Sequence, residues 1–259
     1  MEIKRGHLNQ LLIHWPKGVV AVQAWFTQRG ISRQLAEKYC RSGWIKRIGR
    51  GGYTRTGDVV NLTGAVYALQ AQLGFKTHVG GKTALELQGY GHFLPMKNIP
   101  EFHLFGRPER RLPSWFQGVK WESKVRYHIA RLFSGKPETG LEEISINGYS
   151  IKVSSPERAA LEMVELVPAE QSFEGAGLLL EGLTTLRPAL LQELLRTCLS
   201  IKAKRLFLFL AEKCGHAWVT KLDTSKVRLG SGKRLIVRGG RLDPKYQITV
   251  PADISREVP

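Results

Sequence analysis

The spacing of apolar positions predicts a mixed succession of helices and strands. Three helices are expected near the N-terminus, at 8–13, 20–28 and 33–42. Gly30 is placed to end the second helix, because glycine readily takes the left-handed conformation that follows a helix. Ser32 offers a side-chain oxygen that caps the third helix. The inward face of that third helix is expected to consist of Leu35, Ala36 and Tyr39.

A strand, a glycine-rich turn and a second strand follow the third helix. The residues from Trp44 to Ile48 and from Tyr53 to Arg55 flank the sequence Gly49-Arg50-Gly51-Gly52, which is typical of a small hairpin. Two helices, a short glycine turn, a third helix and a hairpin are the order of a winged helix-turn-helix. The sequence therefore predicts a winged helix-turn-helix DNA-binding domain over residues 1–75.

The rest of the pattern predicts a mixed α/β domain over residues 76–259, and hence an α+β fold for the whole chain. Asn147-Gly148 between alternating strands favours a two-residue hairpin turn. Ser155-Pro156-Glu157 combines a cap, a first-turn proline and an acid at the positive end of a helix. Further helices are expected at 60–73, 82–88, 156–167, 172–183, 188–199 and 201–213. Strands are expected at 102–105, 125–129, 144–146, 149–153, 235–237 and 247–250.

The net charge of +17, from 39 basic and 22 acidic residues among 259, indicates an anionic partner. Nucleic acid is favoured over an acidic membrane or an acidic protein. Residues 1–76 hold 12 basic and 3 acidic residues, and residues 29–55 hold 8 basic residues against the single acid Glu37. The charge is therefore concentrated on the helix at 33–42 and on the hairpin.

This placement suits DNA, because a helix fits the major groove and its outer side chains can reach base edges. A basic hairpin can lie along phosphates or the minor groove, and Gly51 and Gly52 permit a close approach of the backbone. The alternative is a set of solvated charges on a small helical domain. The residues expected to contact DNA on these grounds are Arg33, Gln34, Lys38, Arg41, Lys46, Arg47, Arg50 and Arg55.

A second basic cluster lies in the tail, where residues 221–245 hold 8 basic and 2 acidic residues. It can serve as a second DNA contact, as a contact with RNA, as a dock for an acidic protein or as a solvated face. The residues of this possible second patch are Lys226, Arg228, Lys233, Arg234, Arg238 and Arg241.

Motifs that carry catalysis are incomplete. Gly80-Gly81-Lys82-Thr83 resembles the end of a phosphate-binding loop, but Lys76 stands where the first glycine is required, so a helix start is the better interpretation. Gly230-Ser231-Gly232-Lys233 is interpreted as a turn for the same reason. Glu122-Ser123-Lys124 has the Glu-x-Lys spacing of some metal-dependent nucleases, yet no aspartate precedes it nearer than Asp58, and Glu101 is the available substitute.

The remaining residue types support neither a metal site nor a cofactor. The four aspartates are unpaired in sequence, the seven histidines form no HxxxH pair, and the three cysteines form no CxxC pair. The sequence therefore predicts no catalytic residue, no cofactor and no enzyme activity. It shows neither a signal peptide nor a membrane span, so a reducing cytoplasm is the expected location.

Two groups of segments resemble the AbiEi antitoxins. The segment from Gly30-Ile31-Ser32 through Trp44 to Tyr53 is similar to the N-terminal winged domain of that family. The residues from Ile151 to Ala159 and the tail from Gly230 to Pro251 are similar to its C-terminal antitoxin domain. The resemblance covers nearly the whole chain, in the same order.

The resemblance implies an antitoxin of a bacterial toxin–antitoxin pair linked to abortive phage infection. It implies two partners, which are repeated operator DNA and a nucleotidyltransferase-like toxin, opposed directly or only functionally. It implies autorepression through the winged domain, toxin neutralisation through the C-terminal domain and no catalytic residue. The matched DNA-facing positions are Ser32, Arg33, Gln34, Lys38, Arg41, Lys46, Arg47, Arg50, Tyr53 and Arg55.

Two other functions stay open at this point. The first is a winged-helix transcription regulator whose C-terminal domain senses a ligand or holds a dimer. The second is a metal-dependent nuclease that the winged domain delivers to DNA.

Overall fold

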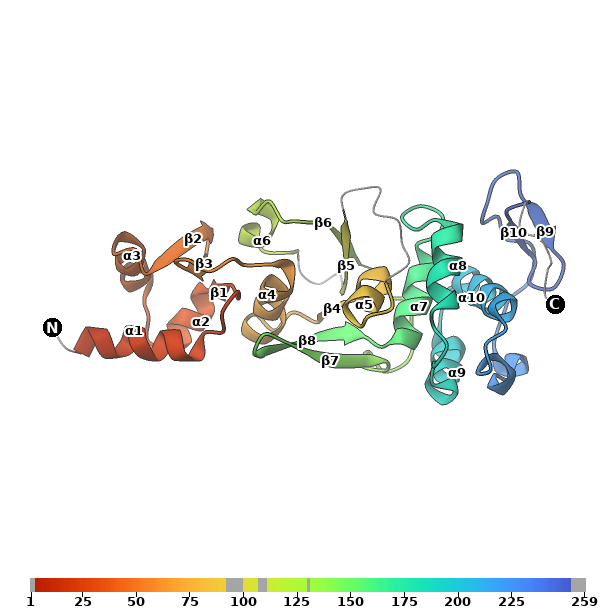
Figure 1. Cartoon of the computed structure of the whole chain (residues 1–259), viewed down its shortest axis with the longest axis horizontal. Coiled ribbons are helices and arrows are strands. Elements are labelled where there is room, and N and C mark those ends of the chain that lie inside the picture. The colour runs from red at the N-terminus through yellow and green to blue at the C-terminus, as the bar shows by residue number, and fades with distance from the viewer. Residues whose placement is uncertain (1–2, 92–99, 107–110, 130, 253–259) are drawn as a thin grey trace. The chain divides into compact units, whose positions relative to one another are not determined.

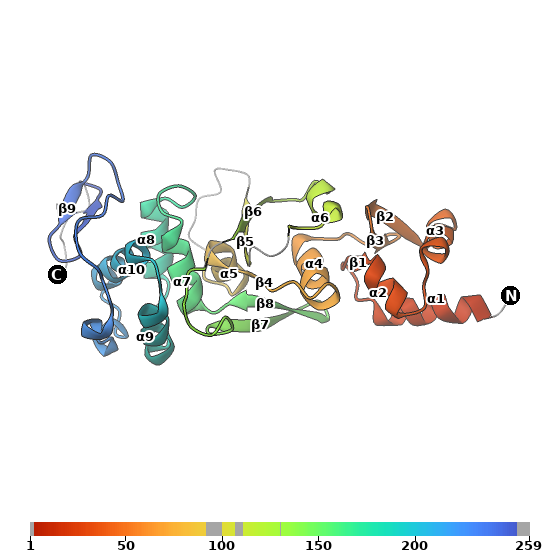
Figure 2. The same cartoon turned by 180° about the vertical axis from the view of Figure 1, so that it is seen from behind.

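The N-terminal segment folds as helices and a short sheet (Figures 1 and 2), and its apolar side chains form a small core. The computed structural model describes residues 3–91, 100–106, 111–129 and 131–252. Trp15 and Phe26 are fully buried, with ring centroids 5.5 Å apart. The three predicted helices are present as α1 (Ile3–His14), α2 (Gln23–Gln28) and α3 (Arg33–Arg41).

The second helix is shorter than the sequence predicts. Residues 20–28 were expected to be helical throughout, but β1 (Ala21–Val22) precedes α2 and pairs antiparallel with the second strand of the predicted hairpin. The amide of Gln72 holds this extended segment, since it accepts a hydrogen bond from Val22 N at 2.8 Å and donates one to Val20 O at 2.9 Å. A side chain distant in sequence therefore decides where the helix begins.

The predicted hairpin, which is the wing of the domain, is confirmed as β2 (Ile45–Gly49) and β3 (Gly52–Arg55). Together with β1 it forms a three-stranded sheet in the order β1-β3-β2. Arg47 pairs with Tyr53, and the register shifts between Arg47 and Gly49. Gly51 has a φ of +83°, the left-handed conformation that favours glycine in such a turn.

The predicted helix at 60–73 is α4 (Leu62–Tyr67) continued by a π-helical segment, η1 (Ala68–Gln72). Asn61 caps α4 by accepting a hydrogen bond from Gly64 N at 2.9 Å. Two short elements follow, β4 (Thr77–Val79), which the sequence did not predict, and α5 (Gly81–Leu87), which it did.

Five strands form a second sheet in the order β6-β5-β4-β8-β7. Its members are β4, β5 (Glu101–Gly106), β6 (Lys124–His128), β7 (Leu141–Ile146) and β8 (Tyr149–Ser154), and the short helix α6 (Ser114–Gly118) lies between β5 and β6 in sequence. β5 and β6 are parallel, as are β4 and β8. Asn147 and Gly148 have φ values of 47° and 88°, which confirms the predicted two-residue turn between β7 and β8.

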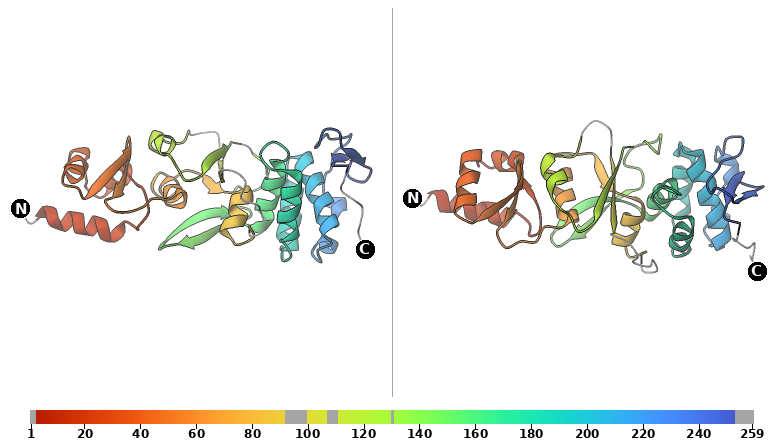
Figure 3. Two further views of the ribbon diagram at one scale, coloured as in Figure 1. Left: turned by 45° about the horizontal axis from the view of Figure 1, so that its top comes forward. Right: turned by 90° about the horizontal axis from the view of Figure 1, so that it is seen from above.

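Four helices follow the sheet, and the predicted boundaries are close to the observed ones. They are α7 (Pro156–Glu165), α8 (Phe173–Glu181), α9 (Pro188–Thr197) and α10 (Ile201–Cys214), shown green to blue in Figure 3. Ser155, Ser172 and Ser200 each cap a helix by accepting a backbone hydrogen bond. α7 contacts α8, α9 and α10.

The tail differs from its prediction in two strands, because the one predicted at 235–237 is absent and the one observed at Arg241–Asp243 was not predicted. Two short 3₁₀ turns, η2 (Val219–Lys221) and η3 (Thr224–Lys226), precede β9 (Arg241–Asp243) and β10 (Ile248–Val250), which pair antiparallel. The strand predicted at 235–237 is wrong. The backbone N–H groups of Ile236 and Val237 donate instead to the Thr249 hydroxyl, at 2.8 and 3.2 Å, so they form no ladder there.

The fold class predicted from the sequence, α+β with an N-terminal winged helix-turn-helix, is confirmed. The chain divides into two compact units. The first consists of Met1–His78, Ile99–Ile129 and Glu143–Lys152, and the second of Val79–Asn98, Ala130–Glu142 and Val153–Pro259. The predicted domain boundary between residues 75 and 76 stays a prediction. Within the described ranges no helix has the length and apolar character needed to cross a membrane.

Candidate nucleic-acid interface

α3 presents a polar face whose orientation is set by a cap and by buried side chains of the helix itself. The Ser32 hydroxyl caps the helix by accepting a hydrogen bond from Leu35 N at 3.2 Å. Ala36 and Tyr39 are buried and hold the helix against the core, whereas Leu35 is only half-buried. The opposite face is therefore left to solvent. The predicted DNA-facing residues on this exposed face are Ser32, Arg33, Gln34, Lys38 and Arg41.

The wing exposes three of its predicted cations, Lys46, Arg47 and Arg50. Arg55 is only half-buried, but its guanidinium donates to the backbone carbonyl of Leu12 and its Cζ lies 5.8 Å from the Trp15 ring centroid. Arg55 therefore ties the wing to α1 from within.

Tyr53 also faces the protein interior. It is 3% exposed, its ring stacks on Phe26 with centroids 5.0 Å apart, and its hydroxyl donates to Gln23 Oε1 at 3.0 Å. Hydrogen bonding to Tyr53 raises the pKa of Arg47, which lies directly opposite in the β-ladder. Tyr53 and Arg55 were grouped with the other DNA-facing positions because sequence adjacency does not distinguish the two faces of a short strand.

One acidic residue joins the helix to the wing. Glu37 on α3 accepts a hydrogen bond from Arg47 Nη2 at 2.8 Å, and its other oxygen lies 3.9 Å from Arg41 Nε. The sequence shows Glu37 as the single acid between residues 29 and 55 but does not indicate this contact, because Arg47 is ten residues away.

The wing requires glycine for two different structural reasons, a positive φ angle and a close neighbour. Gly51 supplies the positive φ of the turn. Gly49 and Gly52 make room for Trp115 of α6, because a Cβ on either would lie within 2.9 Å of Trp115 atoms. The expectation that Gly52 opens the backbone to DNA is therefore corrected, since the space beside it is filled by a buried tryptophan.

The second basic patch, in the second unit, is partly neutralised. Lys226 pairs with Asp223 at 2.8 Å, and hydrogen bonds from Lys226 and Ser225 lower the pKa of Asp223 to about 2. Arg234 is half-buried, and its backbone bonds with Gln247. Lys226 stays exposed despite its pair with Asp223, and Arg228, Lys233, Arg238 and Arg241 are exposed as well.

The Gly230-Ser231-Gly232-Lys233 segment folds around a buried arginine. Arg205 is 3% exposed, and its guanidinium donates to the carbonyls of Leu229, Gly230 and Gly232 at 2.7, 3.0 and 2.6 Å. Carbonyls that point inward to a cation are the reverse of a phosphate-binding loop, in which N–H groups point to an anion. The interpretation of this segment as a turn is supported.

The other glycine-rich motif begins α5, as predicted. Gly81 N donates to the carboxylate of Glu162 at 3.1 Å, and the same oxygen accepts from the Ser154 hydroxyl at 2.7 Å. Arg158 Nε donates to the second oxygen at 2.9 Å. Glu162 is 1% exposed, so a buried protein carboxylate takes the place that a phosphate holds in a phosphate-binding loop.

The carboxylates of the nuclease hypothesis have structural partners. Glu122 Oε1 accepts a hydrogen bond from Leu62 N, at the start of α4, at 3.1 Å. Glu101 pairs with Arg126 at 2.7 Å across the parallel strands β5 and β6.

Burial raises the pKa of the Cys198 and Cys214 thiols to about 11, which favours their unreactive form.

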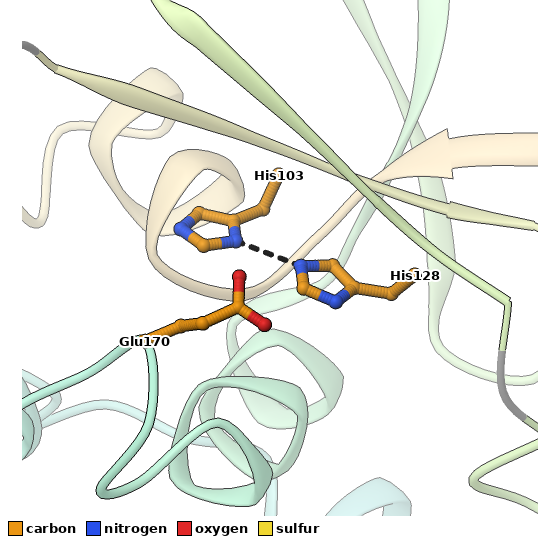
Figure 4. A group of neighbouring side chains, drawn as sticks. All are labelled: His103, His128 and Glu170. Atoms are coloured by element: carbon orange, nitrogen blue, oxygen red, sulfur yellow. Dashed lines mark hydrogen bonds between the residues drawn. The ribbon is translucent and has the colours of Figure 1, made fainter.

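Two histidines of the first unit lie together on β5 and at the end of β6 (Figure 4). The rings of His103 and His128 stack at an interplanar angle of 12°, and Nδ1 of His103 is 2.9 Å from Nε2 of His128. Figure 4 also draws Glu170, a residue of the second unit. Within the first unit the pair offers two nitrogen ligands, whereas protein zinc sites use three or four protein ligands.

Comparison with known proteins gives two matches that cover the chain. Residues 4–96 match the model of an AbiEi antitoxin N-terminal domain of transcriptional regulators, and residues 100–251 match the model of a transcriptional regulator, AbiEi antitoxin, of type IV toxin–antitoxin systems. No curated protein matches. The crystal structure of the RV2827C protein from Mycobacterium tuberculosis is similar, with a TM-score of 0.57 and 16% identity over 96% of this chain and 91% of that one. This likeness concerns the fold.

Proposed function

Because the chain belongs to the AbiEi antitoxin family of type IV toxin–antitoxin transcriptional regulators, we propose that it binds operator DNA through α3 and the wing and thereby represses its own operon. The observation that carries this proposal is the exposure of the basic side chains on α3 and the wing, while the inward side chains of both elements form a core. The charge therefore lies on the two elements that a winged helix-turn-helix presents to DNA.

The proposed contacts divide by element. The α3 residues Arg33, Gln34, Lys38 and Arg41 face base edges, with Ser32 at the first turn, and the wing residues Lys46, Arg47 and Arg50 complete the surface. Tyr53 and Arg55 support the wing from inside and are not among the proposed contacts.

The C-terminal segment 76–259 is proposed to oppose a cognate nucleotidyltransferase-like toxin. The match of residues 100–251 to an antitoxin model favours this role over that of a ligand sensor or dimerisation module. The contacts of Glu122 with Leu62 N and of Glu101 with Arg126 count against the nuclease alternative that was built on these two carboxylates. The exposed cations of the second patch support an additional contact with an anionic partner.

The experiment measures both activities in one cell. A reporter is placed behind the DNA upstream of the protein's own gene, and the adjacent gene, as the toxin, is expressed from an inducible promoter. We expect the wild-type chain to repress the reporter and restore growth. Arg33→Ala with Arg50→Ala should release the reporter yet still restore growth, because neither residue lies in the C-terminal segment. Full repression by this double variant would contradict the proposed DNA surface, and growth arrest despite the wild-type chain would contradict the antitoxin role.

A further inference from the structure

Glu37 is an acid placed among cations. It is the only acidic residue between Arg29 and Arg55, and it lies one helical turn from both Arg33 and Arg41 on α3. A carboxylate in this position repels the phosphates that the neighbouring cations attract. Charge alone therefore gives no reason for Glu37 on a DNA-binding surface.

Stability gives no strong reason either. Glu37 accepts a hydrogen bond from Arg47 Nη2 at 2.8 Å, but the two side chains are 42% and 53% exposed. An ion pair with that exposure to solvent contributes little to folding. What the contact does achieve is to connect the wing to α3 through the guanidinium of Arg47.

Arg47 is also held from a second direction. Tyr53 lies opposite it in the β-ladder, and the Arg47 Cζ is 5.7 Å from the centroid of the Tyr53 ring. That ring is itself fixed by its stacking on Phe26 and by its hydrogen bond to Gln23. The guanidinium thus lies between a fixed ring and a carboxylate, and most of its five N–H donors remain for another acceptor.

We propose that Glu37 is a positioning residue that fixes Arg47 for a guanine contact, so that Arg47 reads a base instead of following the phosphate backbone. Glu37 belongs to α3, so it holds the Arg47 guanidinium beside the helix that is proposed to enter the major groove, where a guanidinium pairs with O6 and N7 of guanine through two parallel hydrogen bonds. A guanidinium that is already oriented loses less conformational freedom when it binds. This inference rests on the proposed function, because it requires that α3 and the wing bind DNA.

Glu37→Gln separates positioning from charge. The substitution keeps the shape of the side chain, removes its charge and replaces the charge-assisted hydrogen bond from Arg47 with a weaker neutral one. Charge alone predicts tighter binding to every DNA duplex. Positioning predicts that the preference for the specific duplex over a scrambled one falls about tenfold, which is within the range of one bidentate base contact.

The test is fluorescence anisotropy with the full-length chain and two labelled duplexes of equal length and composition. One carries the DNA immediately upstream of the protein's own gene, and the other carries the same bases scrambled. The proteins are the wild type, Glu37→Gln, Arg47→Ala and the double variant. Glu174→Gln, which removes an exposed acid from α8 in the second unit, is the control for net charge.

We expect the ratio of the two affinities to fall in Glu37→Gln and to stay at the wild-type value in Glu174→Gln. Because Glu37 acts through Arg47, the double variant should have the ratio of Arg47→Ala. A merely structural role would weaken binding to both duplexes and leave the ratio unchanged.

Three results would overturn the inference, and they are distinguishable. The positioning role is removed if Glu37→Gln leaves the ratio of the two affinities unchanged. It is also removed if Glu37→Gln lowers that ratio as much in the Arg47→Ala variant as in the wild type. Either result leaves the proposed function standing. A wild-type chain that binds both duplexes equally removes the proposed function and this inference with it.

Discussion

At the scale of single residues, Trp115 explains two glycines of the wing. A Cβ on Gly49 would lie 2.7 Å from the Cα of Trp115, and a Cβ on Gly52 would lie 2.8 Å from its Cγ. The sequence indicates that small residues are needed in this turn. It does not indicate which neighbour requires them, because Trp115 belongs to a helix far along the chain.

Gly49→Ala should destabilise the protein. The new methyl group meets backbone atoms of Trp115, which cannot rotate away, so we expect a loss of about 1–3 kcal/mol in the free energy of unfolding. Urea denaturation measures it. Gly118→Ala is the matched control, since no atom lies within 4 Å of its new Cβ and φ is not positive there. Equal midpoints for the two variants would contradict the close contact.

Arg50 and Tyr53 lie close together in the wing but should behave differently. Arg50 is exposed, and its replacement by alanine should reduce the slope of log affinity against log salt by about 0.9 if it contacts one phosphate. Tyr53→Phe removes a hydroxyl bonded to Gln23, so it should cost about 1 kcal/mol of stability and leave that slope unchanged. Salt titrations of DNA binding and urea denaturation test both, and a reduced slope in Tyr53→Phe would contradict its interior role.

At the scale of elements, local signals predicted most helices, and distant side chains decided the exceptions. Ser32, Ser155 and Asn-Gly at 147–148 act within a few residues, so their caps and turn follow from the sequence. The start of α2 depends on Gln72, and the missing strand at 235–237 depends on Thr249. Such contacts are invisible to periodicity because they join segments far apart in the chain.

α7 shows the same division between local and distant information. Its cap and its proline were predicted, yet its buried charges were not. Glu157 is 1% exposed and accepts hydrogen bonds from the backbone and side chain of Arg187, the closest at 2.7 Å. Burial raises the pKa of Glu157, but these hydrogen bonds outweigh burial and hold the pKa below its ordinary value of 4.5.

The stability of the protein should therefore depend on Glu157 in acid. The pKa of Glu157 is lower in the folded state than in the unfolded state. The stabilisation that Glu157 contributes is therefore complete when the pH is above the pKa of the unfolded state, and it is lost as the pH falls through the pKa of the folded state. Urea denaturation of the wild type and Glu157→Gln at several pH values should give free energies of unfolding that converge below pH 4.5. A difference that stays constant down to pH 3 would contradict the lowered pKa.

At the scale of the whole molecule, most of the net charge of +17 comes from two segments of the sequence, residues 1–76 and 221–245. The structure adds which charges are engaged. Lys226 and Lys245 pair with Asp223 and Glu212, and Arg205 binds backbone carbonyls. Both clusters keep exposed cations, and those of α3 and the wing lie on a helix and a hairpin, which is why we propose this surface and not the second patch as the operator contact.

The most direct test of this account compares two triple variants of the full-length chain. Arg33, Lys38 and Arg50 are replaced by alanine in one, and Arg228, Lys233 and Arg238 in the other, so both lose three positive charges. The measurement is the affinity for the DNA upstream of the protein's own gene relative to a scrambled duplex. We expect the first variant to lose this preference and the second to keep it, with any loss of affinity equal on both duplexes. A preference that survives in the first variant would contradict the claim that α3 and the wing recognise the operator.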